Sequence, residues 1–136
     1  MPEPIKIFTA DNTKVPEGST HEYSCEFEDQ SGAPIALSAI LSMTAWLHDR
    51  ETKTVINRQA QNVKDANGGV LSAGTGGRAV FTLTLDPVDA RIVNRSLEDE
   101  QHRLTLKATW TRGGALADGA LTHKVLYRVV NLEVIP

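Results

Sequence analysis

Paired cysteines are absent from the sequence: its 136 residues include one cysteine, Cys25. A single cysteine excludes an intrachain disulfide and any zinc site built on several cysteines. Cys25 lies on the apolar phase of "HEYSCEFED". We predict a packed, inert thiol there, because a reactive cysteine needs an electropositive and open setting.

Long apolar runs and a strong net charge are also missing. No run approaches the roughly 20 apolar residues that cross a bilayer, and the first residues do not read as a secretory signal. We therefore expect a soluble, cytoplasmic chain without a membrane partner. The net charge is -3, but residues 1–30 hold seven acidic residues against two lysines and so carry -5, which leaves +2 for the rest. This acidic start is either a solvated face or a docking surface for a basic partner.

Motifs that carry chemistry are missing as well. The sequence has no G-x-S-x-G elbow, Walker A loop, dinucleotide-binding glycine fingerprint or zincin helix. A calcium loop starting at Asp65 would need Glu at its twelfth position, where Gly76 stands. The histidines have no partner at metal-ligand spacing; they are His21, His48, His102 and His123. We predict no catalytic residues, no cofactor and no metal, and hence no enzyme. Because no basic stripe is visible, nucleic acid is not an expected partner.

Alternation with period two dominates what is present, and it predicts β-strands with one buried face. The clearest strands are "HEYSCEFE", "LSMTAWLHD", "RAVFTLTLD" and "HRLTLKATW". The side chains predicted to face the core are Tyr23, Cys25, Phe27, Leu41, Met43, Ala45, Leu47, Ala79, Phe81, Leu83, Leu85, Leu104, Leu106, Ala108 and Trp110. Turn-forming segments such as "DQSGAP" and "DANGG" separate the strands, so we predict an all-β sandwich or barrel forming a single domain over residues 1–136.

One segment departs from this pattern. In "DPVDARIVNRSLEDEQ", Asp86 can cap a first turn that has Pro87 at its first position. We predict a short helix near residues 87–93, with Val88, Ile92 and Val93 toward the core.

The two ends of the chain are the predicted interfaces. "IKIFT" forms either an edge strand or part of an N-terminal arm within residues 1–15. The closing segment "LTHKVLYRVVNLEVIP" is partly apolar on both phases, which favours either an interior strand or a strand covered by a partner. The residues predicted for subunit contacts are Ile5, Ile7, Phe8, Leu126, Val130, Leu132 and Ile135.

The order of these segments resembles a known group of proteins. "EGSTHEYSCEFEDQSGAPIALSAILSMTAWLHDRETKTVINR" is similar to immunoglobulin-like domains of tailed-bacteriophage virion proteins, such as the N-terminal domains of upper baseplate proteins. The segments "AVFTLTLDPVDARIVN", "EQHRLTLKATW" and "KVLYRVVNLEVIP" resemble small phage structural proteins often encoded near head genes.

The resemblance implies an antiparallel β-sandwich, Ig-like or jelly-roll-like, in a virion structural protein assembled in the host cytoplasm. It favours a capsid decoration (cement) protein that self-associates as a homo-oligomer and binds the major capsid protein or other virion proteins. A neck, tail or baseplate component is the alternative. A carbohydrate-binding module is a further alternative, resting on Trp46 on the polar phase of its strand.

Overall fold

The computed structural model describes residues 5–7, 13–28, 33–93, 99–111 and 119–130. These residues form nine strands and three short 3-10 helices. The strands are β1 (Ile5–Ile7), β2 (Thr13–Pro16), β3 (His21–Phe27), β4 (Ile40–Asp49), β5 (Val55–Asn62), β6 (Gly69–Ala73), β7 (Ala79–Leu85), β8 (Asp99–Trp110) and β9 (Gly119–Val130). The 3-10 helices are η1 (Leu37–Ala39), η2 (Thr75–Gly77) and η3 (Pro87–Ala90).

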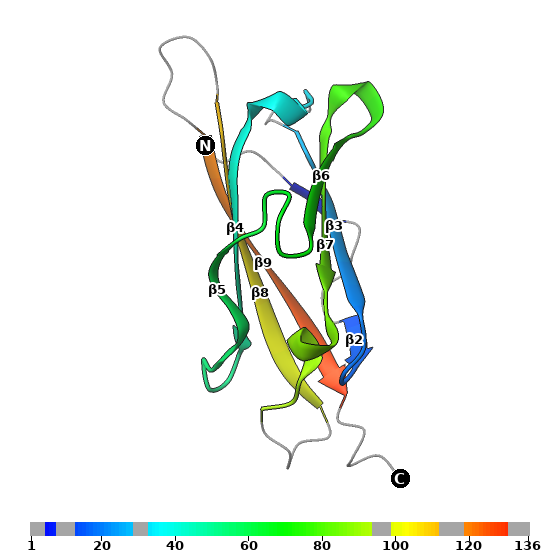
Figure 1. Ribbon diagram of the computed structural model, residues 1–136, viewed down its shortest axis with the longest axis vertical. Coiled ribbons are helices and arrows are strands. Elements are labelled where there is room, and N and C mark those ends of the chain that lie inside the picture. The colour runs from blue at the N-terminus through cyan, green and yellow to red at the C-terminus, as the bar shows by residue number, and fades with distance from the viewer. Residues whose placement is uncertain (1–4, 8–12, 29–32, 94–98, 112–118, 131–136) are drawn as a thin grey trace.

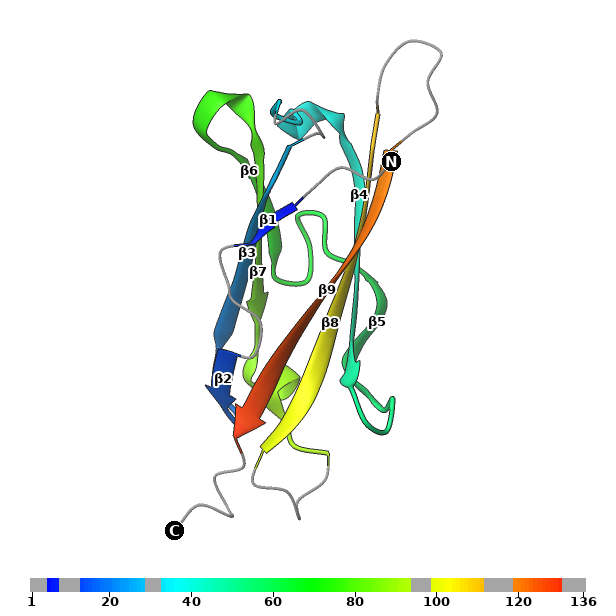
Figure 2. The same cartoon turned by 180° about the vertical axis from the view of Figure 1, so that it is seen from behind.

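The strands form two sheets that face each other along the long axis of the molecule (Figures 1 and 2). One sheet has the order β1-β3-β7-β6 and the other β2-β9-β8-β4-β5. Every pairing is antiparallel except that of β2 with β9. The orders β1-β3-β7-β6 and β9-β8-β4 match the ABED and GFC sheets of an immunoglobulin domain, with β5 beside β4 in the C′ position. The predicted Ig-like antiparallel β-sandwich is therefore confirmed.

Alternate residues of the strands build the core, as predicted. The apolar phases of β3, β7 and β8 are buried without exception from Tyr23 to Phe27, from Ala79 to Leu85 and from Leu104 to Trp110. Cys25 is fully buried, and burial raises the pKa of its thiol to about 12. The prediction of a packed thiol is thus confirmed.

Leu41 contradicts the prediction for β4, since 44% of its surface is exposed. The pairing of β4 with β8 shifts register between Ile40 and Ser42. Such a β-bulge places two residues opposite one and changes which of them points inward. Ile40 takes the core position instead, and only 2% of its surface is exposed.

The predicted short helix is the 3-10 helix η3, and it carries one wrong assignment. Ile92 is buried and Val93 packs partly against the core, but 54% of Val88 is exposed. The residue of η3 that turns inward next to Val88 is Asp89, which Arg58 binds inside the sandwich. The ion pair, together with the burial of Ala90, therefore sets the orientation of this turn.

Three strands did not stand out in the sequence: β2, β5 and β6. In β5 the alternation is obscured because its buried positions include Arg58, Ala60 has a positive φ of 48°, and the pairing with β4 shifts register twice. A strand whose inward phase is polar and whose ladder is interrupted has little period-two signal.

The ends of the described chain pair within the fold. β1 lies at the edge of its sheet against β3, so Ile5 and Ile7 are part of an edge strand. β9 lies between β2 and β8, which confirms the interior-strand alternative. Phe8, Leu132 and Ile135 lie outside the described residues. A search of the described residues found no helix with the length and hydropathy of a membrane span.

Candidate functional site

A row of cations runs along the outer face of the five-stranded sheet. We call Arg103, Lys107, Lys124 and Arg128 the basic stripe; they alternate along β8 and β9 with buried residues. Each of four successive rows across these two strands holds one cation. The paired positions are Lys107 with Thr122, Thr105 with Lys124, Arg103 with Leu126, and Gln101 with Arg128.

The stripe corrects the sequence-based statement that no basic stripe exists. Its members come from two strands and lie 4 to 25 positions apart in the chain, and each is separated from its neighbours by inward-facing residues. Antiparallel pairing brings them onto one surface, because residues opposite each other in a sheet point to the same face.

Three of these four cations have no ion pair with a residue that the structure describes. Arg128 makes a long ion pair of 3.8 Å with Asp99. Arg103, Lys107 and Lys124 make no ion pair with any residue that the structure describes. Like charges held on one surface create a positive potential that attracts an acidic partner.

Trp46 and His48 flank the stripe on the neighbouring strand β4. Trp46 is half-buried and pairs in register with Thr105, and His48 pairs with Arg103. Burial lowers the pKa of His48, and the positive charges of Arg103, Lys53 and Lys124 lower it further. His48 therefore reports on the potential of this face.

We expect Lys124→Glu to raise the pKa of His48, because it replaces a repelling cation by an attracting anion. NMR titration of the His48 imidazole resonances measures the change. Lys64→Glu, a charge reversal in the turn between β5 and β6, is the matched control and should leave the His48 pKa nearly unchanged. Folding lowers the pKa of His48, so protonation of His48 favours the unfolded state. The resulting loss of stability begins as the pH falls through the pKa that His48 has in the unfolded chain. A fall in the His48 pKa on Lys124→Glu would contradict this geometry.

The opposite face of the sandwich carries three acids of the N-terminal region. Glu22, Glu26 and Glu28 alternate with the buried residues of β3. Arg78 bridges Glu26 at 3.5 Å and Glu28 at 3.3 Å, and the backbone of Lys6 pairs with Glu26. The outer face of the four-stranded sheet is thus acidic but partly neutralised, whereas in the stripe only Arg128 has an ion pair with a described residue.

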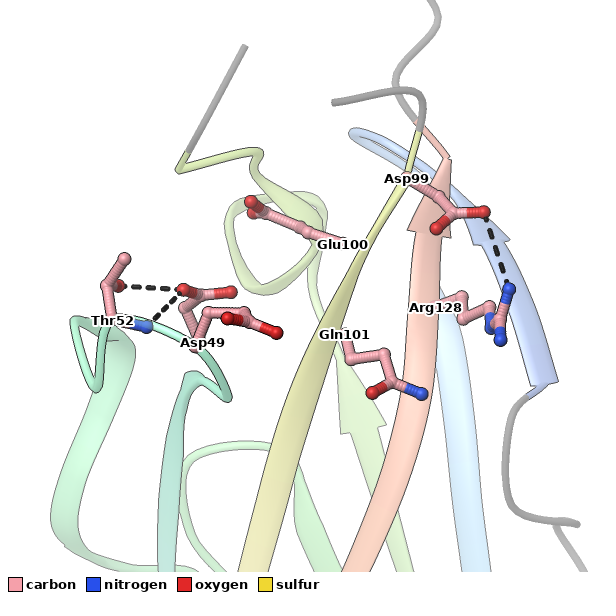
Figure 3. Close-up of a pocket in the computed structure, with 7 residues that line it drawn as sticks. Asp49, Thr52, Asp99, Glu100, Gln101 and Arg128 are labelled. Carbon is pink, nitrogen blue, oxygen red and sulfur yellow. Dashed lines mark hydrogen bonds and ion pairs between the residues drawn. The ribbon is translucent and has the colours of Figure 1, made fainter. Parts of the chain in front are cut away.

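An open pocket of about 580 Å³ lies at one end of the sandwich (Figure 3). It is formed by the end of β4, the turn that follows it, the start of β8 and a residue of β9. The lining residues are Asp49, Glu51, Thr52, Asp99, Glu100, Gln101 and Arg128. Four carboxylates against one guanidinium make the pocket suited to a cation.

Three buried groups meet beside this pocket. Asp49, Glu100 and His102 can each offer one ligand atom, and these atoms lie within 4.8 Å of one another. The group is not visible in the sequence, because Asp49 is about 50 positions from the other two residues. The available signal was local: Glu100 and His102 are two residues apart on a strand and so share a face. The fold places His102 next to two carboxylates, although the sequence shows no histidine at a spacing typical of metal ligands.

The residues predicted for subunit contacts that the structure describes are divided between the two sheets. Leu126 and Val130 are half-buried on the outer face of β9, beside the basic stripe, whereas Ile5 and Ile7 belong to the other sheet. Whether these residues contact a second subunit stays a prediction.

Comparisons with known proteins return structures alone. No protein-family model matches the chain, and no curated protein does. Similar solved structures include Dpr1 IG1 bound to DIP-eta IG1 (8% identity, TM-score 0.35, 94% of this chain and 95% of that chain). AggA, the major subunit of aggregative adherence fimbriae type I from Escherichia coli, has 10% identity, a TM-score of 0.41 and 93% coverage of both chains. Murine CRIg has 7% identity and a TM-score of 0.38, over 93% of this chain and 97% of that chain. These values transfer no function or partner to this chain.

Proposed function

We propose that this protein is a non-enzymatic structural subunit that binds an acidic surface of another protein through the outer face of β8 and β9. The observation that carries the proposal is the basic stripe, in which Arg103, Lys107 and Lys124 have no ion pair with a described residue. A protein that works by docking needs a shaped and charged surface rather than a reactive group.

The composition of this face supports a protein partner. Arg and aromatic residues are enriched at protein interfaces, and the stripe lies beside the half-buried Trp46 and Leu126. Charge complementarity at an interface raises the association rate and selects the partner, while apolar contacts hold the complex. The stripe therefore sets orientation, and Trp46 with Leu126 supplies apolar area.

The particle in which the chain works is proposed from the sequence resemblance. We propose a capsid decoration (cement) protein of a tailed bacteriophage, with the major capsid protein as the acidic partner; a neck, tail or baseplate location is the second possibility. The Ig-like sandwich is compatible with either.

The test uses virus particles assembled without this protein. Purified full-length chain is added back, the particles are sedimented, and bound copies are counted against the major capsid protein. We expect saturable binding in numbers comparable to the shell subunit, weakening as salt rises. Saturation at a few copies would place the chain in the neck or tail, and no binding at any site would overturn the virion proposal.

Charge-reversal variants then test the surface itself. Lys107→Glu combined with Lys124→Glu should weaken binding at least about tenfold, since attraction becomes repulsion at the interface. Lys64→Glu is the matched control, and it should bind like the natural chain. Equal binding by the double variant, or equal affinity of the natural chain for a DNA fragment of random sequence, would contradict docking of an acidic protein on this face.

A further inference from the structure

The cluster beside the pocket has the composition and burial of a metal centre. Asp49 ends β4, and Glu100 and His102 begin β8. Their exposed fractions are 2%, 3% and 0%. Buried carboxylates that lie this close together repel each other unless a cation compensates them.

The hydrogen bonds of the cluster leave one carboxylate oxygen unused. Asp49 Oδ2 accepts bonds from the backbone nitrogen of Thr52 at 2.9 Å and from its hydroxyl at 2.7 Å (Figure 3). Asp49 Oδ1 is buried and has no hydrogen-bond partner among the described residues. A buried acceptor without a partner costs free energy, so such an atom in a native fold calls for a partner such as an ordered water or a bound ion.

The other two side chains are fixed in place. Glu100 Oε1 accepts a bond from the backbone nitrogen of Val93 at 2.6 Å and lies 2.9 Å from His102 Nε2. His102 Nδ1 is a second buried atom without a hydrogen-bond partner in the described part of the chain. The cluster thus holds two unsatisfied buried atoms among three ligand-bearing side chains.

We propose that Asp49, Glu100 and His102 bind a divalent first-row transition-metal ion, with Zn²⁺ the ion that fits best. Two carboxylates and one imidazole form a mixed oxygen and nitrogen donor set that suits Zn²⁺. Ca²⁺ prefers six to eight oxygen ligands, and Mg²⁺ takes oxygen ligands and keeps several waters. Zn²⁺ ligands at about 2.0–2.2 Å stand roughly 3.3 Å apart in a tetrahedral site, a spacing that atoms within 4.8 Å reach by small side-chain rotations.

The pocket completes the site. Asp49 and Glu100 also line the pocket, and Figure 3 shows Glu100 extending from β8 toward the side where Asp49 and Thr52 lie. The pocket gives the ion a path from solvent and leaves room for a water or a partner's side chain as fourth ligand. The surrounding carboxylates of Glu51 and Asp99 attract a divalent cation toward it. This assignment does not depend on the docking proposal.

The test titrates zinc chloride into the full-length chain after chelator treatment, by calorimetry and by thermal unfolding. We expect one ion per chain and a higher unfolding temperature with zinc, because an ion that binds only the native state stabilises it. Asp49→Asn removes the charge with little change of shape and should weaken binding at least about 100-fold. Glu51→Gln, an acid of the same pocket outside the cluster, is the matched control and should lose less than about tenfold.

Two further measurements keep the result clear if Asp49→Asn unfolds. Zinc should shift the NMR resonances of the His102 imidazole in the natural chain, and cobalt(II) should give the visible absorption bands of a tetrahedral site. The proposal is overturned if the natural chain binds no zinc, if the His102 resonances do not move, or if a folded Asp49→Asn variant binds as tightly as the natural chain.

Discussion

Asp89→Ala is expected to lower the free energy of unfolding by about 3–5 kcal/mol, because it leaves the buried guanidinium of Arg58 without its counter-ion. Only 2% of the Arg58 side chain and none of the Asp89 side chain is exposed. The loss of one partner from such a pair costs far more than the pair itself contributes.

The contacts around the pair explain the size of this effect. Arg58 Nε and one terminal nitrogen donate to the two carboxylate oxygens of Asp89 at 3.2 and 3.0 Å. The guanidinium also donates to the carbonyls of Asn67 and Thr84. Asp89 in turn accepts a bond from the backbone nitrogen of Asp86. The pair thus ties β5, the β5–β6 turn, the end of β7 and η3 together, and the variant removes the bonds that Asp89 itself makes, to Arg58 on β5 and to the backbone of Asp86.

Urea denaturation followed by circular dichroism measures the change. Asp99→Ala is the control, since its ion pair is partly exposed and such pairs contribute about 0–1 kcal/mol. Replacing both members of the buried pair, with Arg58→Met and Asp89→Leu together, should recover part of the loss. A loss below about 1 kcal/mol for Asp89→Ala would show that the guanidinium finds another partner or water.

Phe81→Ala should also lower the free energy of unfolding by about 3–5 kcal/mol, because it leaves a cavity in the core beneath the four-stranded sheet. Phe81 is fully buried and lies in register between Cys25 on β3 and Leu71 on β6. Both neighbours are buried too, so the space that Phe81 would leave is enclosed by packed side chains.

The adjacent residue gives a matched control for Phe81→Ala. Val80 belongs to the same strand but points to the outer face and is half-buried. Val80→Ala should cost about 1 kcal/mol or less, since the shortened side chain lies at the outer surface and leaves no closed cavity. Equal costs for the two variants would contradict the assignment of inner and outer faces of β7.

The docking face and the core can be separated by the same variants. Neither Asp89 nor Phe81 lies on the basic stripe, so a folded sample of either variant should bind particles as the natural chain does. Lys107→Glu with Lys124→Glu should instead bind weakly and unfold normally. The two sets of residues therefore have opposite effects on stability and on binding.

Much of the fold follows from the sequence because every second residue of a half-buried strand is apolar. Tyr23, Phe81 and Leu104 could be assigned to the core from alternation alone, and all three are buried. Leu41 and Val88 were wrongly assigned to the core, because alternation did not determine which residues are buried at these two places. A bulge displaced the first, and the burial of Asp89 beside Arg58 displaced the second.

The functional surfaces were visible in the sequence to a much smaller extent. Two features could be found locally: Trp46 lies on the polar phase of its strand, and Arg103 and Lys107 alternate with apolar residues along β8. The stripe, however, needs the register of β8 with β9, which places Lys124 beside Thr105 and Arg128 beside Gln101. No property of either strand alone fixes that register, because it depends on which residues of both strands are buried together.

By itself the sequence determined the class of structure, an all-β sandwich, and the inward set of most strands, since these depend on local periodicity and turn chemistry. Tertiary structure decided where the charges gather and which polar groups are buried. Asp49 reaches Glu100 and His102 only because β4 pairs with β8, and Arg58 reaches Asp89 only because η3 packs on β5. Contacts between distant segments depend on how the strands pair and how the sheets pack, so the local periodicity of the chain does not predict them.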